Sequence, residues 1–366
     1  MELAINPSKI ISTLCYSIFR LEPYTSCPFS CSYCYARWYR KESLGINPKV
    51  IGIFSKVAKK LDMRIAFRLA TLSDPLQDLE EIAKVSLKLM RIAEENEVPI
   101  ILNTKSDRIS KSPWREQINR MAEDNLIVVQ ISISSLKNLE FEKKAPEVEK
   151  RLEALSSIEA PKIVRLQPFL PNYSFDKADE FVEKLKDYGV DQLTVEMLRI
   201  EKRELSIYGK YWDKWSDYSF EGSLIKAEAP EKLEELSNVC KKYGIDFALC
   251  KEGLFNLETA NCCGFHYLEA EIRPTLREVY RELVRKKKIR FEELNEIFRN
   301  FLFGEKLNDL PRLVRKALKY HEKTLIRNLR KREVVERLTP LIKVDDEVLT
   351  LSKSAQNIQR ENPNTV

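Results

Sequence analysis

The stretch RIAFRLATLSDPLQDLEEIAKVSLKLMRIAEENEVPIILNTK (64–105) decides the fold, because it contains a complete strand–helix–strand repeat. Its ends, RIAFRLAT (64–71) and PIILNTK (99–105), are short apolar runs of the kind that form buried strands. Between them, the apolar residues of 78–97 fall mostly on one face of a helix. Two buried strands joined by a helix predict a parallel sheet with helices packed against it.

The same alternation extends over the first 200 residues. Amphipathic helices are predicted at 145–160 and 175–189, and the second ends on Gly189. The remaining strands are predicted in YSIFRLEPY (16–24), LIVVQISIS (126–134), KIVRLQPFL (162–170) and DQLTVEML (191–198). Six strands alternating with helices therefore predict an α/β fold.

Composition narrows the class of protein. The 366 residues are 43% hydrophobic and 32% charged, which excludes a disordered chain and allows one barrel-sized domain plus a smaller part. The N-terminus does not have a signal-peptide pattern and no apolar run approaches about 20 residues, so we expect a cytoplasmic protein with no membrane span. Only 9 glycines and many Lys and Glu favour a thermophile. With only His266 and His321, histidine-based catalysis is disfavoured.

Three cysteines follow the first predicted strand, in YTSCPFSCSYCYARWY (24–39). Cys27, Cys31 and Cys34 have the spacing C-x3-C-x2-C, and cytosolic thiols indicate metal binding or catalysis before disulfides. Three thiolates can hold a [4Fe–4S] cluster and leave one iron open to an outside ligand such as S-adenosylmethionine, whose amine and carboxylate chelate iron. The alternative is structural zinc with a distant fourth ligand, although zinc ribbons usually carry a second C-x2-C pair.

CPFSCSYC (27–34) resembles the cluster loop of the radical S-adenosylmethionine enzymes. The order of CSYCYAR, LSDPLQ, NTKSDRI, ISISS, APEVEKRLEAL and RLQPFLP is similar to the spore photoproduct lyase-like branch over about residues 20–200. The resemblance implies a partial (β/α)6 TIM-type barrel, and the six predicted strands agree. It also implies an enzyme that reductively cleaves S-adenosylmethionine to a 5′-deoxyadenosyl radical and abstracts a hydrogen atom from a substrate. Its partner would be an electron donor such as ferredoxin or flavodoxin.

In a parallel barrel, the reactive groups gather at the carboxyl ends of the strands. Where the superfamily often holds the methionyl amine with a Gly-Gly-Glu stretch, this chain has ATLSDP (70–75). Ser73 and Asp74 can accept from an ammonium group there, or Asp74 can cap the next helix. Lys105 follows the third strand, and the resemblance implies that it pairs with the methionyl carboxylate.

Polar residues on the later strands are further candidates for cofactor contact. Ser132 and Ser134 share one side of the fourth strand, and Arg165 lies on the fifth. If that side of the strands faces the lumen of the barrel, these residues contact the cofactor. The alternative is that they only fill the interior of the barrel with polar side chains. Glu196 interrupts the apolar sixth strand, and Arg165 is its predicted partner.

Three residues bear on the pocket and on the reaction. Tyr33 and Tyr35 are predicted to form walls of the S-adenosylmethionine pocket. Spore photoproduct lyases have, at the end of the second strand, a cysteine that returns a hydrogen atom to the product radical. The corresponding residue here is Thr71, whose O–H bond is a poor hydrogen-atom donor. Spore photoproduct is therefore not the expected substrate.

A second cysteine group lies in VCKKYGIDFALCKEGLFNLETANCCGFH (239–266). Cys250, Cys262, Cys263 and, with less support, Cys240 are predicted to hold a second, auxiliary iron–sulfur cluster. The alternatives are zinc with His266 as a ligand, a disulfide, or buried free thiols. Cys15 is predicted to be an ordinary core cysteine.

We expect three regions: the barrel (1–204), a cysteine-rich extension with an aromatic-rich run at 208–220 (205–273), and a basic helical region (274–366). The stretch from Arg312 to Arg337 is rich in Arg and Lys, with Tyr320 and His321 between them, and either contacts nucleic-acid phosphates or is a solvated helix face. The predicted substrate is thus a nucleic acid or nucleotide. The alternatives are a peptide-modifying enzyme, or a non-catalytic zinc or iron–sulfur protein that binds nucleic acid.

Overall fold

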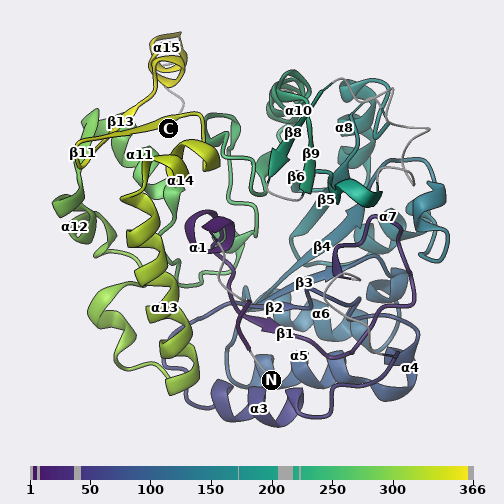
Figure 1. The fold of residues 1–366 in the computed structure, drawn as a ribbon. Helices are drawn as coiled ribbons and strands as arrows, with labels where there is room; N and C mark the ends of the chain where they lie inside the picture. Colours follow the sequence, from purple (N-terminus) through teal and green to yellow (C-terminus); the bar gives the residue numbers. More distant parts are fainter. Residues whose placement is uncertain are drawn as a thin grey trace.

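The structure is a computed structural model that describes residues 3–5, 9–36, 43–171, 173–204, 217–221 and 224–361. Most of the aromatic-rich run at 208–220 lies outside these residues. A central sheet, helices around it and a separate helical layer make up the molecule (Figure 1). None of the helices among the described residues has the length and hydropathy required to cross a membrane.

The central sheet is open and entirely parallel, with seven strands in the order β1-β2-β3-β4-β5-β6-β10. It confirms the predicted α/β class and the partial barrel, and each of the six predicted strands is present. The strands are β1 (Arg20–Leu21), β2 (Phe67–Leu69), β3 (Ile100–Thr104), β4 (Ile127–Ile133), β5 (Lys162–Phe169), β6 (Gln192–Met197) and β10 (Asp246–Leu249). Apolar side chains of the strands and surrounding helices form the largest core.

The seventh strand, β10, was not predicted. Its four residues, Asp246–Leu249, pair with β6 from Gln192 to Val195 and lie in the segment predicted as the cysteine-rich extension. That segment therefore contributes directly to the sheet. A run of four residues is too short to show a periodicity in the sequence. A small antiparallel sheet, β7 (Arg199–Glu201), β9 (Leu224–Glu228) and β8 (Asp217–Glu221), lies between β6 and β10 in the chain.

The helices around the sheet follow the predicted pattern, with one exception at 78–97. A single helix was predicted there, but the chain forms α4 (Leu79–Ala83) and α5 (Val85–Glu95), with Lys84 at φ 49° between them. The cause is Glu80, a buried carboxylate that accepts from the backbone N–H of Ser86 and Leu87 at 2.9 Å and so satisfies the start of α5. The others are α3 (Val50–Ala58), α6 (Trp114–Glu123), α7 (Val148–Ser156), α8 (Ala178–Asp187) and α10 (Pro230–Tyr243).

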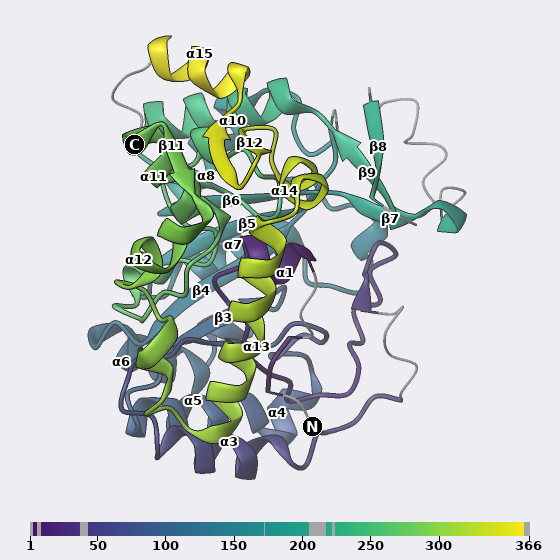
Figure 2. The same cartoon turned by 60° about the vertical axis from the view of Figure 1, so that its left-hand side comes forward.

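The C-terminal region is a helical layer beside the barrel with its own apolar core (Figure 2). The N-terminal helix α1 (Lys9–Leu14) lies between this layer and the barrel and packs against α13. Near the end of the chain, β12 and β13 form an antiparallel hairpin, and β13 also pairs with β11. The elements are α11 (Leu276–Lys286), β11 (Lys288–Arg290), α12 (Leu294–Phe298), α13 (Arg312–Leu329), α14 (Arg332–Leu338), β12 (Ile342–Asp345), β13 (Val348–Leu351) and α15 (Lys353–Glu361).

Candidate cluster and cofactor site

Cys27, Cys31 and Cys34, which we call the loop thiols, lie on the loop that follows β1, at the carboxyl edge of the sheet. The loop is fixed by two backbone hydrogen bonds, from Cys34 N–H to the carbonyl of Cys31 (3.0 Å) and from Ser32 N–H to the carbonyl of Phe141 (3.1 Å). Cys31 is buried, whereas Cys27 and Cys34 are half-buried. The cysteines are therefore held in place but remain open on one side.

The acidity of the loop thiols follows from their surroundings. Burial, with the Asp74 carboxylate nearby, raises the pKa of the Cys27 thiol to about 12. Burial, opposed by Lys105, raises the pKa of the Cys31 thiol to about 11. Both thiols are therefore protonated at neutral pH, and a metal that bound them as thiolates would displace their protons.

The loop thiols fit an iron–sulfur cluster better than a single ion. In the part of the chain that the structure describes, no three or more His, Cys, Asp or Glu side chains are arranged to hold one metal ion. A cubane cluster presents its irons at separate corners, so its thiolates need only surround it rather than converge on one point. Three soft sulfur donors on one loop match that requirement, and they leave one iron without a protein ligand.

Glu22, directly after β1, is a buried carboxylate at this edge that the sequence analysis missed. Its Oε1 accepts from Thr71 Oγ1 (2.5 Å), Thr71 N–H (2.8 Å) and Leu72 N–H (3.0 Å), and its Oε2 accepts from Ser73 Oγ (3.3 Å). The available signal was a charged residue at the end of an apolar strand. The hydroxyls of Thr71 and Ser73 therefore hold the carboxylate of Glu22 in place. The hydroxyl of Tyr35 donates to the carbonyl of Thr71 at 2.6 Å.

Asp74 joins the ends of β2 and β3. Its Oδ1 accepts from Thr104 Oγ1 (2.7 Å) and Leu76 N–H (2.9 Å), and its Oδ2 accepts from Lys105 N–H (2.7 Å). The predicted alternative, a helix cap, is wrong, because α4 begins at Leu79, five residues later, with Asp78 at its N-cap. Burial raises the pKa of Asp74, while these hydrogen bonds oppose the rise.

Lys105 lies at the carboxyl end of β3 and is the centre of a polar cluster. Its ammonium group forms an ion pair with Glu142 at 3.0 Å and donates to the carbonyl (3.3 Å) and hydroxyl (3.2 Å) of Ser132. It also lies 5.7 Å from the ring centroid of Tyr33. The ammonium group of Lys105 is therefore at the place where the sequence predicts a cation for the methionyl carboxylate. In this structure, it is paired with the carboxylate of Glu142.

Glu142 connects this polar cluster to the cysteine loop. Its carboxylate accepts from the hydroxyl of Tyr33, from Ser134 Oγ (2.7 Å) and from Arg151 Nη1 (2.6 Å). Burial alone would raise its pKa, but Lys105, Arg151 and these hydroxyls hold the pKa down to about 2. We call Tyr33, Lys105, Ser134, Glu142 and Arg151 the Glu142 network. It fixes Tyr33 between two of the three cysteines.

A second polar cluster lines the lumen. Glu196 lies 3.6 Å from Arg165 across β5 and β6, as predicted, and also pairs with Lys251 at 2.7 Å. Gln167 accepts from Arg165 (2.9 Å) and donates to Glu196 (2.6 Å). Burial would raise the pKa of Glu196, but the charges of Lys251, Arg199 and Arg165 lower it to about 2. Arg165 is thus inside the barrel, but it is bound to protein groups.

The second cysteine group lies inside the barrel, among apolar residues of the central strands. The loop at 261–268 enters the lumen and packs against Val128 and Ile163, where Gly264 (φ 71°) is required because a Cβ would lie 2.6 Å from Ile163 Cδ1. Cys262 and Cys263, 2% and 1% exposed, have sulfur atoms 3.8 Å apart. The Cys263 sulfur also accepts from Arg68 Nη2 at 3.1 Å.

Cys250 and Cys15 complete this group, which we call the lumen thiols. Cys250 is close enough to Cys262, and Cys15 to Cys263, for each thiol to shift the pKa of its neighbour, while the Cys15 thiol donates to the carbonyl of Ser17 at 3.0 Å. Cys240 does not join them, because it lies on α10 in the outer core. Cys15, predicted as an ordinary core residue, takes that place. The nitrogen atoms of His266 face Asn261 (3.1 Å) and Asp246 (3.5 Å) instead of the sulfur atoms.

Comparison with known proteins identifies likenesses of fold. No family model matches the chain, and no curated protein is significantly similar to it. A structure of spore photoproduct lyase with dinucleoside spore photoproduct is 15% identical, with a TM-score of 0.45, over 64% of this chain and 76% of that one. Native anSMEcpe with bound AdoMet and a peptide is 11% identical, with a TM-score of 0.42, over 66% of each chain. Another of the spore photoproduct lyase structures also has bound AdoMet.

Proposed function

We propose that the protein is a radical S-adenosylmethionine enzyme. The observation that carries the proposal is the C-x3-C-x2-C loop at the carboxyl edge of a parallel sheet, where catalytic groups of such sheets gather. When bound, a [4Fe–4S] cluster with an open iron and S-adenosylmethionine would supply a 5′-deoxyadenosyl radical, which abstracts a hydrogen atom from the substrate. The loop thiols would hold the cluster.

The chain's own groups have separable roles in holding the cofactor. Tyr33 and Tyr35 flank Cys34 in the sequence and supply aromatic walls. Lys105 supplies a cation for the methionyl carboxylate, and the Glu142 network fixes its position. Because the Asp74 carboxylate already accepts from Leu76, Thr104 and Lys105, we assign the ammonium group to Glu22, assisted by Ser73. Ser132 and Ser134 orient Lys105 and Glu142.

We further propose that the lumen thiols hold a second iron–sulfur cluster, with Cys15 rather than Cys240 as the fourth ligand. Three buried thiols, Cys250, Cys262 and Cys263, with the half-buried Cys15 beside Cys263, offer four sulfur ligands. Arg68 donates to Cys263, Arg165 donates to the carbonyl of Cys262, and the charge of Arg277 acts on the Cys262 thiol. These cations would balance the negative charge of a thiolate-bound cluster.

Iron and sulfide analysis after anaerobic reconstitution tests both clusters. The wild-type protein should bind about eight irons per chain, and the variant C27A/C31A/C34A about four, with complete loss of 5′-deoxyadenosine formation under dithionite. C15A/C262A/C263A should also bind about four but keep the cluster of the loop thiols. C240A is the matched control and should keep about eight. Stoichiometric zinc with no cleavage of S-adenosylmethionine would refute the enzyme; unchanged iron in C15A/C262A/C263A would refute the second cluster.

We propose a nucleic acid or nucleotide as the substrate, rather than spore photoproduct. The support is the basic C-terminal layer, together with Thr71, which stands at the hydrogen-donor position and whose hydroxyl donates to Glu22. Product analysis with nucleic-acid and peptide substrates separates this proposal from a peptide-modifying enzyme. Deuterium transfer from a labelled oligonucleotide into 5′-deoxyadenosine would support it; transfer only from peptides would contradict it.

A further inference from the structure

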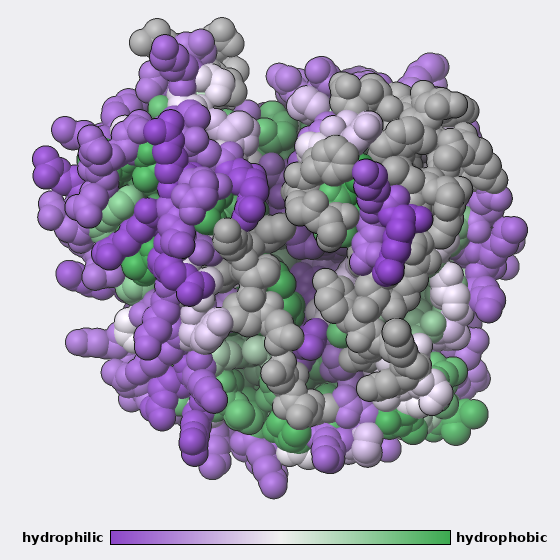
Figure 3. All heavy atoms as spheres, viewed as in Figure 1, coloured by the Kyte–Doolittle hydropathy of each residue, from purple (hydrophilic) through white to green (hydrophobic). Residues whose placement is uncertain are grey.

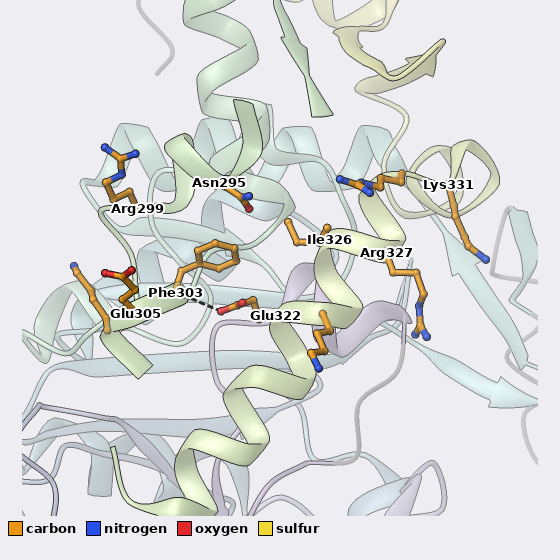
Figure 4. Close-up of a pocket in the computed structure, with 12 residues that line it drawn as sticks. Asn295, Arg299, Phe303, Glu305, Glu322, Ile326, Arg327 and Lys331 are labelled. Carbon is orange, nitrogen blue, oxygen red and sulfur yellow. Dashed lines mark hydrogen bonds between the residues drawn. The ribbon is translucent and has the colours of Figure 1, made fainter. Parts of the chain in front are cut away.

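A groove of about 1150 Å³ lies in the C-terminal layer, between α13 and the segment from α12 to η7 (Gly304–Leu307). We call it the α13 groove. Phe303 comes from one wall and Ile326 from the other, and Glu322 fixes the walls together by accepting from the N–H of Gly304 at 2.9 Å (Figure 4). The two walls of the groove are therefore joined by a hydrogen bond and each contributes an apolar side chain, and the groove is on the side of the molecule away from α8 and α10 (Figure 1).

The charge of the α13 groove is strongly positive. Its lining has two carboxylates, Glu305 and Glu322, against six cations: Arg299, Lys306, Lys323, Arg327, Arg330 and Lys331. All six cations are exposed. In the described ranges, none of the six has a carboxylate partner within ion-pair distance. Hydrophilic side chains cover this side of the molecule (Figure 3).

The positive charge continues along α13 beyond the groove. Arg312, Lys316 and Lys319 precede Lys323 at intervals of three or four residues, which places them on one face of the helix with Arg327 and Arg330. This stripe extends over the 18 residues of α13, or about 27 Å. Tyr320, whose side chain is 56% exposed, lies beside it. Lys319 and Arg315 donate to Asn308, a neutral residue, so their charge is retained.

A line of unpaired cations beside exposed aromatic surface matches the phosphodiester backbone of a nucleic acid. The exposed cations follow α13 for its whole length, whereas a small anion would be bound by a few donors that enclose it. Phe303 and Ile326, the apolar side chains of the groove, are only half-exposed, whereas a membrane-binding face would project large apolar side chains into the lipid. Single strands combine regularly spaced phosphates with bases that stack on aromatic rings.

We propose that the α13 groove and the basic stripe of α13 bind a single-stranded nucleic acid through its phosphates. This surface lies outside the part of the chain that carries the cysteine loop, and the inference does not rest on the proposed radical chemistry. The proposed enzyme would thus have a second binding surface, which would hold a polynucleotide independently of the site where the reaction occurs.

Fluorescence anisotropy with a labelled single-stranded oligonucleotide of mixed sequence, in RNA and DNA forms, tests the proposal. The variant K323Q/R327Q/R330Q should bind about tenfold to a hundredfold more weakly at 0.1 M salt, and the slope of log K against log salt should fall by about 2. The matched control K184Q/K186Q/K241Q removes three exposed lysines from α8 and α10 and should change affinity less than about twofold. Thermal melting checks that both variants are folded.

Two further variants keep the outcomes distinct. E305Q removes a repulsive carboxylate from the groove without removing a cation, so it should strengthen binding. C27A/C31A/C34A should bind as well as wild type, which separates this surface from the proposed enzyme activity. The proposal is overturned if the wild type does not bind the oligonucleotide, if the control loses as much affinity as the groove variant, or if only vesicles containing phosphatidylserine are bound.

Discussion

The loop thiols and the lumen thiols have the same chemistry in opposite surroundings. The loop thiols lie at the edge of the sheet, half-buried in two cases, and are positioned by a backbone loop and by the Glu142 network. Three of the lumen thiols, Cys250, Cys262 and Cys263, lie in one buried cluster inside the barrel, with buried arginines donating to the Cys263 sulfur and the Cys262 carbonyl; only Cys15 is half-buried. Cysteines that are open on one side can admit an outside ligand, whereas an enclosed set can hold only what is built into the fold.

The two regions also differ in how they are anchored. The Glu142 network joins residues at one end of the barrel: the residues that follow β3 and β4, Glu142 before α7, Arg151 within α7, and the cysteine loop. Arg277, in contrast, comes from α11 of the C-terminal layer and donates to the carbonyls of Leu14 and Leu249, one in the N-terminal segment and one in β10. The lumen side is thus the place where the layers of the protein are joined.

The largest effect on this comparison should come from Arg277→Ala. The guanidinium group is fully buried and also forms a two-bond ion pair with Glu258, at 2.8 and 3.0 Å. Removal leaves a buried carboxylate without its cation, so we expect a loss of about 4 to 5 kcal/mol in the free energy of unfolding. Arg281→Ala is the control: this exposed arginine of the same helix should cost less than about 1 kcal/mol. Denaturant unfolding measures both, and equal losses would contradict the anchoring role.

Glu142→Gln tests the loop side. The substitution leaves Lys105 and Arg151 without their shared carboxylate, so we expect a loss of about 3 kcal/mol at neutral pH. Since the pKa of Glu142 is lowered to about 2, its contribution is complete above the ordinary value near 4.5 and is lost as the pH falls toward 2. The stability difference between wild type and variant should therefore shrink across that window. The exposed Glu140→Gln is the control, and a pH-independent difference would contradict this explanation.

The comparison also shows what sequence can predict. The six strands followed from apolar runs with a strand period, and the cysteine loop followed from spacing alone. The lumen thiols could not be assembled in this way, because Cys15 and Cys263 are brought together only by the three-dimensional fold, while Cys240 is near in sequence and remote in space. Glu22 was missed for a different reason: its signal is a single residue.

Alkylation rates sharpen the difference in access. In metal-free protein treated with iodoacetamide, Cys27 and Cys34 should react at least about tenfold faster than Cys262 and Cys263, because the enclosed thiols require local opening of the barrel. Cys240, fully buried in the outer core, should react as slowly as the lumen thiols and serves as the internal reference. Peptide mass mapping over time gives each rate, and denaturant should make them similar. Equal rates for Cys34 and Cys262 in the folded protein would refute the enclosed environment.

The smallest effect should come from Thr71→Val, at the loop side. Valine has nearly the same shape but lacks the hydroxyl that donates to Glu22 at 2.5 Å. Glu22 keeps the backbone donors of residues 71 and 72 and the hydroxyl of Ser73, so we expect a loss of only about 1 kcal/mol in the free energy of unfolding. Thr71→Ser keeps the hydroxyl and should recover most of it. If Thr71→Val instead cost as much as Arg277→Ala, the carboxylate of Glu22 would depend on that one hydroxyl, and the edge of the sheet would be no more tolerant of change than the lumen.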